Sequence, residues 1–124
     1  MVDGDFMWAV GYFEGEGCLG AFKRGRYRQP RMIVTSTDLA LLERFQSVVK
    51  YGTVRQVQLH SGLSSKPQWQ WELTRQVDID DLLTYMMPHL SQRRKEKGDE
   101  IFAYIHRDRG INAASYSSAS LGEQ

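Results

Sequence analysis

The 124-residue sequence predicts an α+β fold in a single domain, and three observations lead to this prediction. A helix-forming stretch opens the chain, four short β-prone segments follow in two pairs separated by a helix, and two further helices close it. Each pair of strands reads as a hairpin, so we expect a four-stranded antiparallel sheet with helices on one face and a basic face left open. A chain of this length has room for only one hydrophobic core.

The composition excludes several classes of protein. The 41% apolar and 25% charged content is typical of a soluble globular domain. Cys18 is the single cysteine, which excludes an internal disulfide framework and a cysteine-based zinc site. The sequence shows no signal-peptide pattern and no 18-residue apolar run, so we expect a cytoplasmic protein with access to DNA and no membrane partner. The net charge of +1 says little about a nucleic-acid partner.

The first helix, expected to begin near Phe6 and to stop at residues 15–17, is apolar on two sides. Phe6, Ala9, Val10 and Phe13 follow helical spacing on one side. The second side carries Met7, Trp8, Gly11, Tyr12 and Gly15. A helix that is apolar all round is buried all round, so we expect the second side to pack on another copy of the chain. Glycines four residues apart would let two such helices approach closely.

Two carboxylates, Glu14 and Glu16, fall at the C-terminal end of this helix. The helix dipole is negative there and destabilises anions, so a bound metal cation would explain their presence. The alternative is a solvated turn with a glycine cap, which is common at helix ends.

The first hairpin is expected over residues 18–36, with its turn at Gly25 and residues 26–29. It carries five cations and no acid over nine positions, namely Lys23, Arg24, Arg26, Arg28 and Arg31. If Met32 and Val34 face the core, then Arg31, Ile33 and Thr35 share the outer face. Such a face suits phosphate contacts and insertion into a DNA groove, whereas the alternative is a solvated edge hairpin.

A core helix follows, with Thr37 as the expected N-cap, Asp38 in the first turn, and an end at Tyr51-Gly52. The second hairpin is then expected over 53–60 and 68–74, where Trp69, Trp71 and Leu73 alternate toward the core. Its outer face would carry Arg55, Gln68, Gln70 and Glu72. Glutamine can read adenine in the major groove, although solvent-facing polar residues would give the same pattern.

A short helix over 78–87 stops at Pro88, and the last helix opens near Leu90. Its first residues include Arg93, Arg94, Lys95 and Lys97. Because a helix N-terminus also carries partial positive charge, these cations predict an anion site at the start of the helix. Gly98, farther along, predicts a kink. The Ser- and Ala-rich sequence from Gly110 onward indicates a domain over residues 1–109 and a flexible tail over 110–124.

The segment Ala9-Val-Gly-Tyr-Phe-Glu-Gly-Glu-Gly17 resembles the nine-residue motif of the LAGLIDADG homing endonucleases. The glycines of that motif match Gly11 and Gly17, and its acidic pair matches Glu14 and Glu16. The similarity continues in order through residues 34–39, 51–54, 69–73 and 88–93. The chain carries one such motif and in this respect resembles the members of the family that act as homodimers.

The resemblance implies an αββαββα unit whose saddle-shaped sheet lies in the DNA major groove, with the motif helices at a two-fold interface. It also implies cleavage of both strands of a long, roughly palindromic duplex with Mg²⁺ or Mn²⁺. The metal ligands would be Glu16 and the Gly15 carbonyl, while Glu14 would act closer to structure. Arg93 matches the position of an active-site lysine in many relatives, with Arg94 or Lys95 as alternatives.

Two other functions fit the same sequence. Ala40 stands where relatives often place a polar group near the scissile phosphate, which favours a DNA- or RNA-binding protein of this fold that no longer cuts, such as a maturase or a regulator. A small dimeric scaffold with no nucleic-acid role is the third interpretation. A steep dependence of DNA affinity on salt would separate the first two functions from the scaffold.

Overall fold

The structure is a computed structural model that describes residues 3–57 and 67–117. The chain forms helix α1 (Gly4–Glu16), strands β1 (Gly17–Arg24) and β2 (Tyr27–Ser36), helix α2 (Leu39–Val49), strands β3 (Thr53–Val57) and β4 (Gln68–Leu73), helix α3 (Gln76–Met86), the short 3₁₀ helix η1 (Met87–His89) and helix α4 (Gln92–Ser117). The predicted α+β class and αββαββα order are confirmed. No described helix combines the length and hydrophobicity that a bilayer crossing requires.

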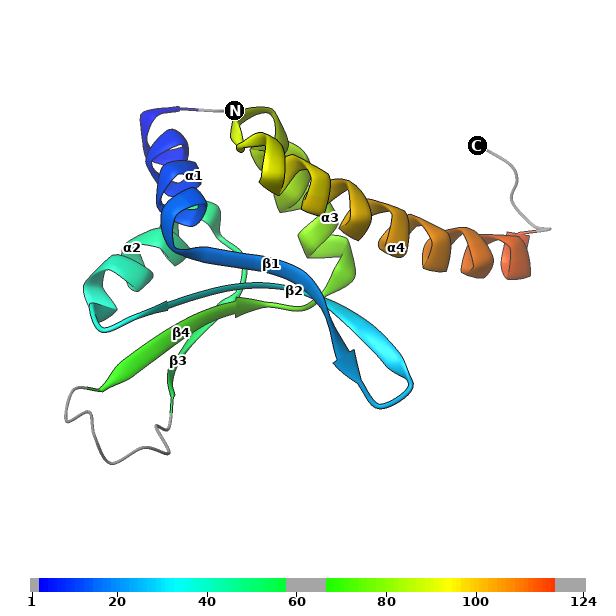
Figure 1. The fold of residues 1–124 in the computed structure, drawn as a ribbon, viewed down its shortest axis with the longest axis horizontal. Helices are drawn as coiled ribbons and strands as arrows, with labels where there is room; N and C mark the ends of the chain where they lie inside the picture. Colours follow the sequence, from blue (N-terminus) through cyan, green and yellow to red (C-terminus); the bar gives the residue numbers. More distant parts are fainter. Residues whose placement is uncertain (1–2, 58–66, 118–124) are drawn as a thin grey trace.

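The four strands form one antiparallel sheet in the order β1-β2-β4-β3. The helices lie on one face of this sheet, and the other face is left open (Figure 1). The tip of the β1–β2 hairpin and the opposite ends of β3 and β4 bend away from the helices, so the open face is concave (Figure 1). The predicted arrangement of helices on one side of a saddle-shaped antiparallel sheet is therefore confirmed.

Strand register decides which side chains reach the core. Met32 lies opposite Leu73 and Val34 lies opposite Trp71, and the side chains of all four are buried. Because side chains alternate along a strand, the neighbouring pairs Ile33–Glu72 and Thr35–Gln70 belong to the open face, as predicted.

The core joins α1, α2 and the sheet through aromatic rings. Phe13 of α1 stacks on Phe45 of α2 with the ring centroids 6.5 Å apart. Phe45 in turn meets Trp71 of β4 edge-on at 4.8 Å, and the Trp71 indole N–H donates to the Tyr51 carbonyl at 2.7 Å. Edge-to-face pairs of this kind contribute about 0.5–1.5 kcal/mol beyond the area they bury.

Several predicted boundaries differ from the structure. The first hairpin turns at Gly25 and Arg26 alone, because Tyr27 already pairs with Arg24. Asp38, not Thr37, caps α2, since its carboxylate accepts from the Leu41 N–H at 3.2 Å while the Ser36 hydroxyl accepts from the Asp38 N–H. Strand β3 ends at Val57, and the rest of the predicted 53–60 strand lies outside the described residues.

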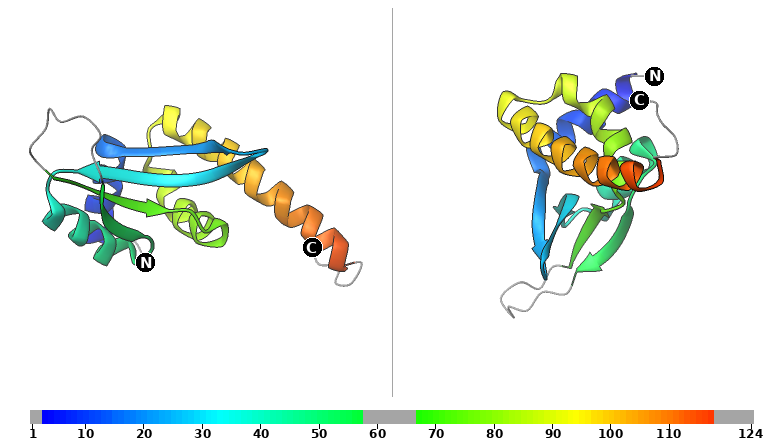
Figure 2. Two further views of the ribbon diagram at one scale, coloured as in Figure 1. Left: turned by 90° about the horizontal axis from the view of Figure 1, so that it is seen from below. Right: turned by 90° about the vertical axis from the view of Figure 1, so that its right-hand side faces the viewer.

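The predicted kink at Gly98 is wrong. Helix α4 runs without a break from Gln92 to Ser117 (Figure 2). Gly98 is buried, and a Cβ atom there would lie 2.4 Å from the sulfur of Met87, so the glycine allows α4 to pack closely on η1. The helix also continues past Gly110, whereas the flexibility of the tail over 110–124 stays a prediction.

Candidate functional site

The chain turns sharply from helix to strand where α1 ends. Gly17 caps the helix, and its N–H donates to the Phe13 carbonyl. A Cβ atom on Gly17 would lie 2.4 Å from the Phe13 ring and 2.7 Å from the Phe13 carbonyl oxygen, both closer than real Cβ contacts. A glycine here lets β1 begin directly after Glu16, so the turn delivers Glu14 and Glu16 to the end of the helix.

Glu14 is held by the start of α4. One carboxylate oxygen accepts from the Ser91 N–H at 2.9 Å, and the other lies 3.4 Å from Nε of Arg94. Arg94 is only 8% exposed, and its Nη2 donates to the Gly17 carbonyl at 2.7 Å. Its guanidinium also lies 5.3 Å from the centre of the Phe13 ring. The first turn of α4 is therefore fastened to the end of α1.

This contact changes the interpretation of two predicted features. Burial raises the pKa of Glu14, but the hydrogen bonds from Ser91 and the charges of Arg94 and Arg93 outweigh it, so the pKa lies below its ordinary value. Glu14 is thus paired within the chain, with Arg94 and the Ser91 N–H. The predicted anion site at the start of α4 holds this carboxylate, and Arg94 lies inside the protein, away from the open face.

Glu16 differs from Glu14. Its side chain is exposed, and within the described ranges it makes no ion pair and no hydrogen bond. It borders a shallow hollow lined by Gly11, Tyr12, Gly15, Ser36 and Leu41. Burial, with a smaller contribution from the Glu16 charge, raises the pKa of the Tyr12 hydroxyl, which stays protonated beside this carboxylate.

The ligands at this end of α1 match a hard divalent cation in kind. The Glu16 carboxylate and the Gly15 carbonyl are oxygen donors, which Mg²⁺ prefers. Among the residues that the structure describes, no group of three or more His, Cys, Asp or Glu side chains gathers to hold a metal. One protomer therefore offers a partial site, which further oxygen ligands from elsewhere would have to complete.

The second side of α1 is largely open in the single protomer. Gly11 and Gly15 are exposed, and a Cβ atom on either would meet nothing within 4 Å. Met7 is 41% exposed. Trp8 stacks on Tyr12 with centroids 5.2 Å apart, and the Arg44 guanidinium lies 3.8 Å from the Trp8 ring centre. The five residues predicted to form a dimer interface thus lie together on one accessible side.

The open sheet face brings together most of the predicted DNA-contacting side chains. Arg31 pairs with Glu72 across the strands and lies 5.3 Å from the centre of the Phe22 ring. Arg55 and Thr35 are exposed on the same face. Ile33, Gln68 and Gln70 are half-buried there. The charge of Arg31 is therefore compensated by Glu72, whereas Arg55 makes no ion pair with any residue in the described ranges.

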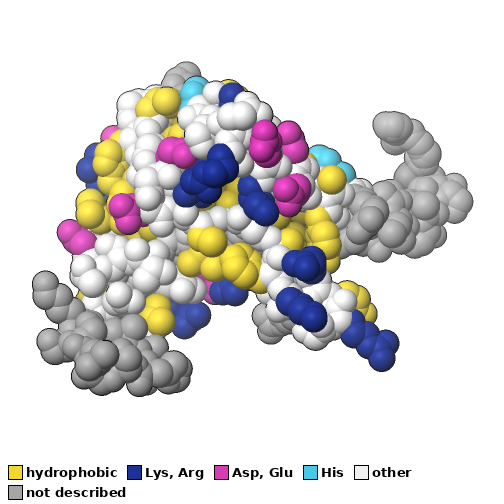
Figure 3. All heavy atoms as spheres, in the orientation of Figure 1, with side chains coloured by type: hydrophobic (Ala, Val, Ile, Leu, Met, Phe, Trp, Pro, Cys, Tyr) yellow, Lys and Arg dark blue, Asp and Glu magenta, His cyan; other side chains and the backbone are white. Residues whose placement is uncertain are grey.

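The hairpin cations do not share one face. Lys23 lies opposite Arg28 in the register, on the side of the sheet that Met32 occupies, and Arg31 lies on the other side. Nη1 of Arg28 donates to the Ala21 carbonyl at 3.2 Å. Arg26 is exposed at the turn, and the side chain of Arg24 lies outside the described part. Figure 3 shows Lys and Arg side chains projecting from this hairpin.

The fold is similar to that of known proteins, although the sequence alone matches no protein-family model and no curated protein. Solved structures do match. The homing endonuclease I-CvuI in complex with the I-CreI target matches with a TM-score of 0.65 and 20% identity, over 82% of this chain and 65% of that one. The group I intron-encoded homing endonuclease I-CeuI, complexed with DNA, matches with a TM-score of 0.67 and 15% identity, over 94% of this chain and 59% of that one. The LAGLIDADG homing endonuclease I-GzeII, in complex with its DNA target, matches with a TM-score of 0.67 and 15% identity, over 90% of this chain and 38% of that one.

The chain has the fold of the LAGLIDADG homing endonucleases. It spans less than two thirds of the length of each of these three chains. In this LAGLIDADG fold, residues 9–17 form the later part of α1 and the turn into β1.

Three contacts near the site could not be foreseen from the sequence. Arg94 binds Glu14 and Gly17, Arg44 covers Trp8, and the Tyr104 hydroxyl of α4 bonds both backbone groups of Arg28. Each joins elements far apart in the chain, so no local pattern indicates it. The Arg31–Glu72 pair could have been found, because opposite charges stand on neighbouring strands of the predicted sheet.

Proposed function

We propose that this chain is a site-specific DNA endonuclease that works as a homodimer with a divalent metal ion and cleaves a long, pseudo-palindromic duplex. The observation that carries the proposal is the exposed Glu16 at the end of α1, without an ion-pair partner among the described residues, in a fold whose solved examples include proteins described in complex with DNA. An unpaired carboxylate at the negative end of a helix would be stabilised by a bound cation. Glu14 nearby is already paired with Arg94.

The concave sheet face would lie in the major groove. Gln68 and Gln70 stand on that face of β4 and could read adenine, while Arg55 and Thr35 could reach phosphates or base edges. The hairpin residues Lys23, Arg24, Arg26 and Arg28 would contact the phosphate backbone. Arg31 and Ile33, with Glu72, would complete the reading surface.

The second protomer would pack on the open side of α1, across Met7, Trp8, Gly11, Tyr12 and Gly15. Two helices that meet at glycines can approach closely, which would bring the two Glu16 carboxylates near the same stretch of duplex. Such a two-fold dimer would match a palindromic target, whose two half-sites are related by the same symmetry.

The chemistry would be hydrolysis of a phosphodiester bond in each strand. Mg²⁺ or Mn²⁺, when bound, neutralises charge at the phosphate and activates water. Glu16 and the Gly15 carbonyl would hold this ion, and the exposed Arg93 would stabilise negative charge on the phosphate. Because a guanidinium is a poor proton donor, the role of Arg93 would be electrostatic. Arg94 is occupied by Glu14 and Gly17, which leaves Lys95 as the second candidate beside Arg93.

The test uses duplex DNA that rejoins the sequences flanking the gene, incubated with the protein in Mg²⁺, in EDTA, and with Glu16→Gln. We expect a discrete Mg²⁺-dependent double-strand cut that Glu16→Gln abolishes, while DNA affinity stays within about threefold of the wild type, because one exposed side chain changes little else. Glu43→Gln, at an exposed acid on α2, is the matched control and should cut normally.

Tight binding without a cut would instead favour a DNA- or RNA-binding protein that has lost catalysis. Ala40, exposed at the start of α2, is the residue that favours this second function, since it provides no polar group. A flat dependence of DNA affinity on salt would contradict both functions and leave the scaffold interpretation.

A further inference from the structure

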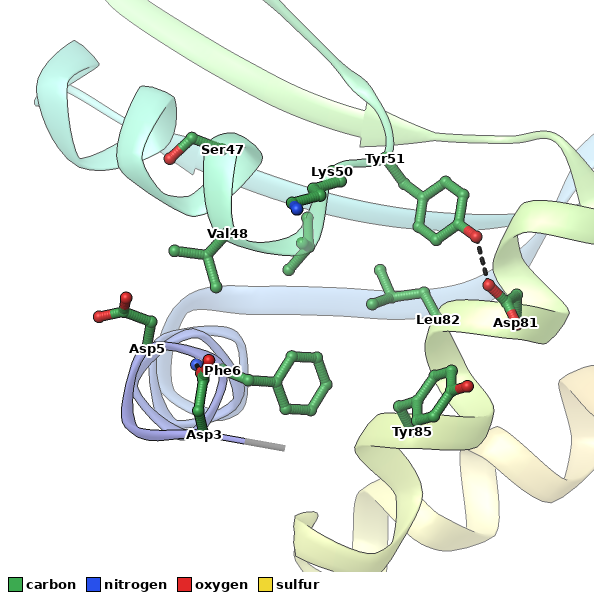
Figure 4. Close-up of a pocket in the computed structure, with 11 residues that line it drawn as sticks. Asp3, Asp5, Phe6, Ser47, Val48, Lys50, Tyr51, Asp81, Leu82 and Tyr85 are labelled. Atoms are coloured by element: carbon green, nitrogen blue, oxygen red, sulfur yellow. Dashed lines mark hydrogen bonds between the residues drawn. The ribbon is translucent and has the colours of Figure 1, made fainter. Parts of the chain in front are cut away.

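A groove on the helical side of the molecule has no role in the proposed function. It lies between the N-terminal turn of α1, the end of α2 and the middle of α3 (Figure 4). Phe6, Leu82 and Tyr85 point into it from α1 and α3, and Val48, Val49 and Tyr51 line it from the α2 side. Apolar and aromatic side chains therefore form its floor and walls.

The rim of the groove is acidic. Asp3, Asp5 and Asp81 line it, and Lys50 is the one basic residue among the described residues of its lining. An adjoining hollow shares Tyr51, Asp81 and Tyr85 and adds Asp78 and Asp80. Arg75 lies 4.0 Å from Asp78 and partly compensates its charge, and Nε2 of His106 lies 2.8 Å from Oδ1 of Asp80, within hydrogen-bond distance. The excess of carboxylates makes this surface attractive to cations and repulsive to phosphates.

Two of the three carboxylates on the rim already accept a hydrogen bond, yet both keep further acceptor positions. Asp3 caps α1 by accepting from the Phe6 N–H at 2.9 Å, and Asp81 accepts from the Tyr51 hydroxyl. Asp5 is exposed and makes no ion pair or hydrogen bond with any described residue. A carboxylate has about four acceptor positions, so all three could still bind a cationic side chain.

Part of the apolar surface at the groove and the adjoining hollow is exposed to solvent. Tyr85 is 51% exposed and Val77, in the adjoining hollow, is 45% exposed. They are two of the four large hydrophobic residues that are exposed among the described residues. Apolar residues gathered at a groove and rimmed by charge are typical of a protein-binding surface.

The groove and the open sheet face do not overlap. The described residues that line the groove come from helices and their flanking turns, and none comes from a strand. These helices cover the face of the sheet that lies opposite the open face (Figures 1 and 4). A partner in the groove could therefore stay bound while the sheet contacts DNA. The excess of carboxylates in the lining repels phosphates and so disfavours nucleic acid as the occupant.

We propose that this groove binds a basic amphipathic segment of a partner protein. Apolar side chains on one face of the segment would enter between Phe6, Leu82 and Tyr85, and flanking Lys or Arg side chains would pair with Asp5 and Asp81. Charge complementarity selects this occupant, because a neutral apolar peptide would leave the acidic rim uncompensated. A helix with apolar residues at i and i+4 matches such a groove.

The test uses the full chain and a fluorescein-labelled helical peptide with leucines at i and i+4 and lysines between them. We expect saturable binding by fluorescence anisotropy. The double variant Asp5→Asn/Asp81→Asn should weaken it about tenfold or more, and Tyr85→Ser should weaken it to a similar extent. The amide that replaces the Asp81 carboxylate keeps an acceptor for the Tyr51 hydroxyl, so the fold is retained, which thermal unfolding checks. Asp99→Asn, at an exposed acid on α4 outside the groove, is the matched control and should bind like the wild type.

Three outcomes would overturn the proposal. Absence of saturable binding is the first. The second is an equal loss with Asp99→Asn, or equal binding of a peptide with serine in place of leucine, because both indicate diffuse charge attraction. The third is a self-assembly in sedimentation that the groove variants abolish, which would make a second copy the occupant. None of these measurements depends on DNA, so the result is independent of the proposed endonuclease.

Discussion

Arg94→Met tests the contact that fastens α4 to the end of α1. The substitution keeps an unbranched apolar stem against the Phe13 ring but removes the guanidinium. It leaves the Gly17 carbonyl without its 2.7 Å donor and leaves Glu14 without its ion-pair partner. Arg93→Met is the matched control, because Arg93 is the preceding residue in the chain and is exposed.

The expected loss can be worked out from these contacts. A hydrogen bond from a charged donor, such as the one from Arg94 to the partly buried Gly17 carbonyl, contributes about 1.5–3 kcal/mol to the free energy of unfolding. The pair with Glu14 adds about 1 kcal/mol or less, since the Glu14 side chain is 31% exposed and can regain water. We therefore expect Arg94→Met to lower the free energy of unfolding by about 3 kcal/mol, which lowers the melting temperature by roughly 10 °C. Arg93→Met should stay within about 0.5 kcal/mol of the wild type.

Urea unfolding, followed by the fluorescence of the buried Trp71, measures both variants at one protein concentration, so that any self-association is held constant. A double-mutant cycle with Glu14→Gln isolates the pair, and we expect a coupling of about 1 kcal/mol. If Arg94→Met were as mild as Arg93→Met, or if Arg94 and Glu14 showed no coupling, the structural role of Arg94 would be refuted. Arg94 would then return as a candidate phosphate contact.

Three further predictions concern the charges and glycines of the site. The pKa of Glu14 lies below its ordinary value of 4.5, so the stability that its ionised form contributes is present above pH 4.5 and is lost as the pH falls through the lower folded value. The difference in free energy of unfolding between wild type and Glu14→Gln should therefore shrink in acid. Urea unfolding across a pH series measures this difference, and a constant difference would contradict the prediction. Glu72→Gln frees the charge of Arg31, so the log–log salt slope of binding to random duplex should steepen by about 0.9, as measured by anisotropy, whereas Glu43→Gln should leave the slope unchanged. Gly11→Ala should stabilise an isolated protomer by up to about 1 kcal/mol, because its Cβ meets nothing, yet it should raise the dimer dissociation constant in sedimentation equilibrium if the helices meet at Gly11; a stabilised protein with unchanged association would argue against that interface.

The fold could be predicted from the sequence because its signals are local. The alternation through Trp69, Trp71 and Leu73 and the outward placement of Arg31, Ile33 and Thr35 follow from the two-residue period of a strand, and both hold in the structure. Helix ends were less predictable. Thr37 and Asp38 are both good caps, and only the Ser36 hydroxyl, through its bond with the Asp38 N–H, distinguishes them.

The candidate site was predictable only in part. The pairing of Glu14 with Arg94 depends on where α4 lies relative to α1, which no pattern in either segment specifies. A run of cations at a helix start gives the same signal whether they bind phosphate or a carboxylate of the same chain, so Arg93 and Arg94 could not be told apart. Burial separates them, and burial is a property of the packed chain.

The contacts between the start of α4 and the end of α1 also determine when this part of the chain can fold during synthesis. The Ser91–Glu14 and Arg94–Gly17 hydrogen bonds each close a loop of 77 positions. A nascent chain on the ribosome carries Glu14 and Glu16 early, but it lacks the partners that fix the α1–β1 turn until synthesis has passed Arg94. Such long-range closure slows folding, and we expect the end of α1 to take its final shape only after Arg94 has been translated. A messenger truncated before this point would yield a chain with the complete motif and no fastened turn.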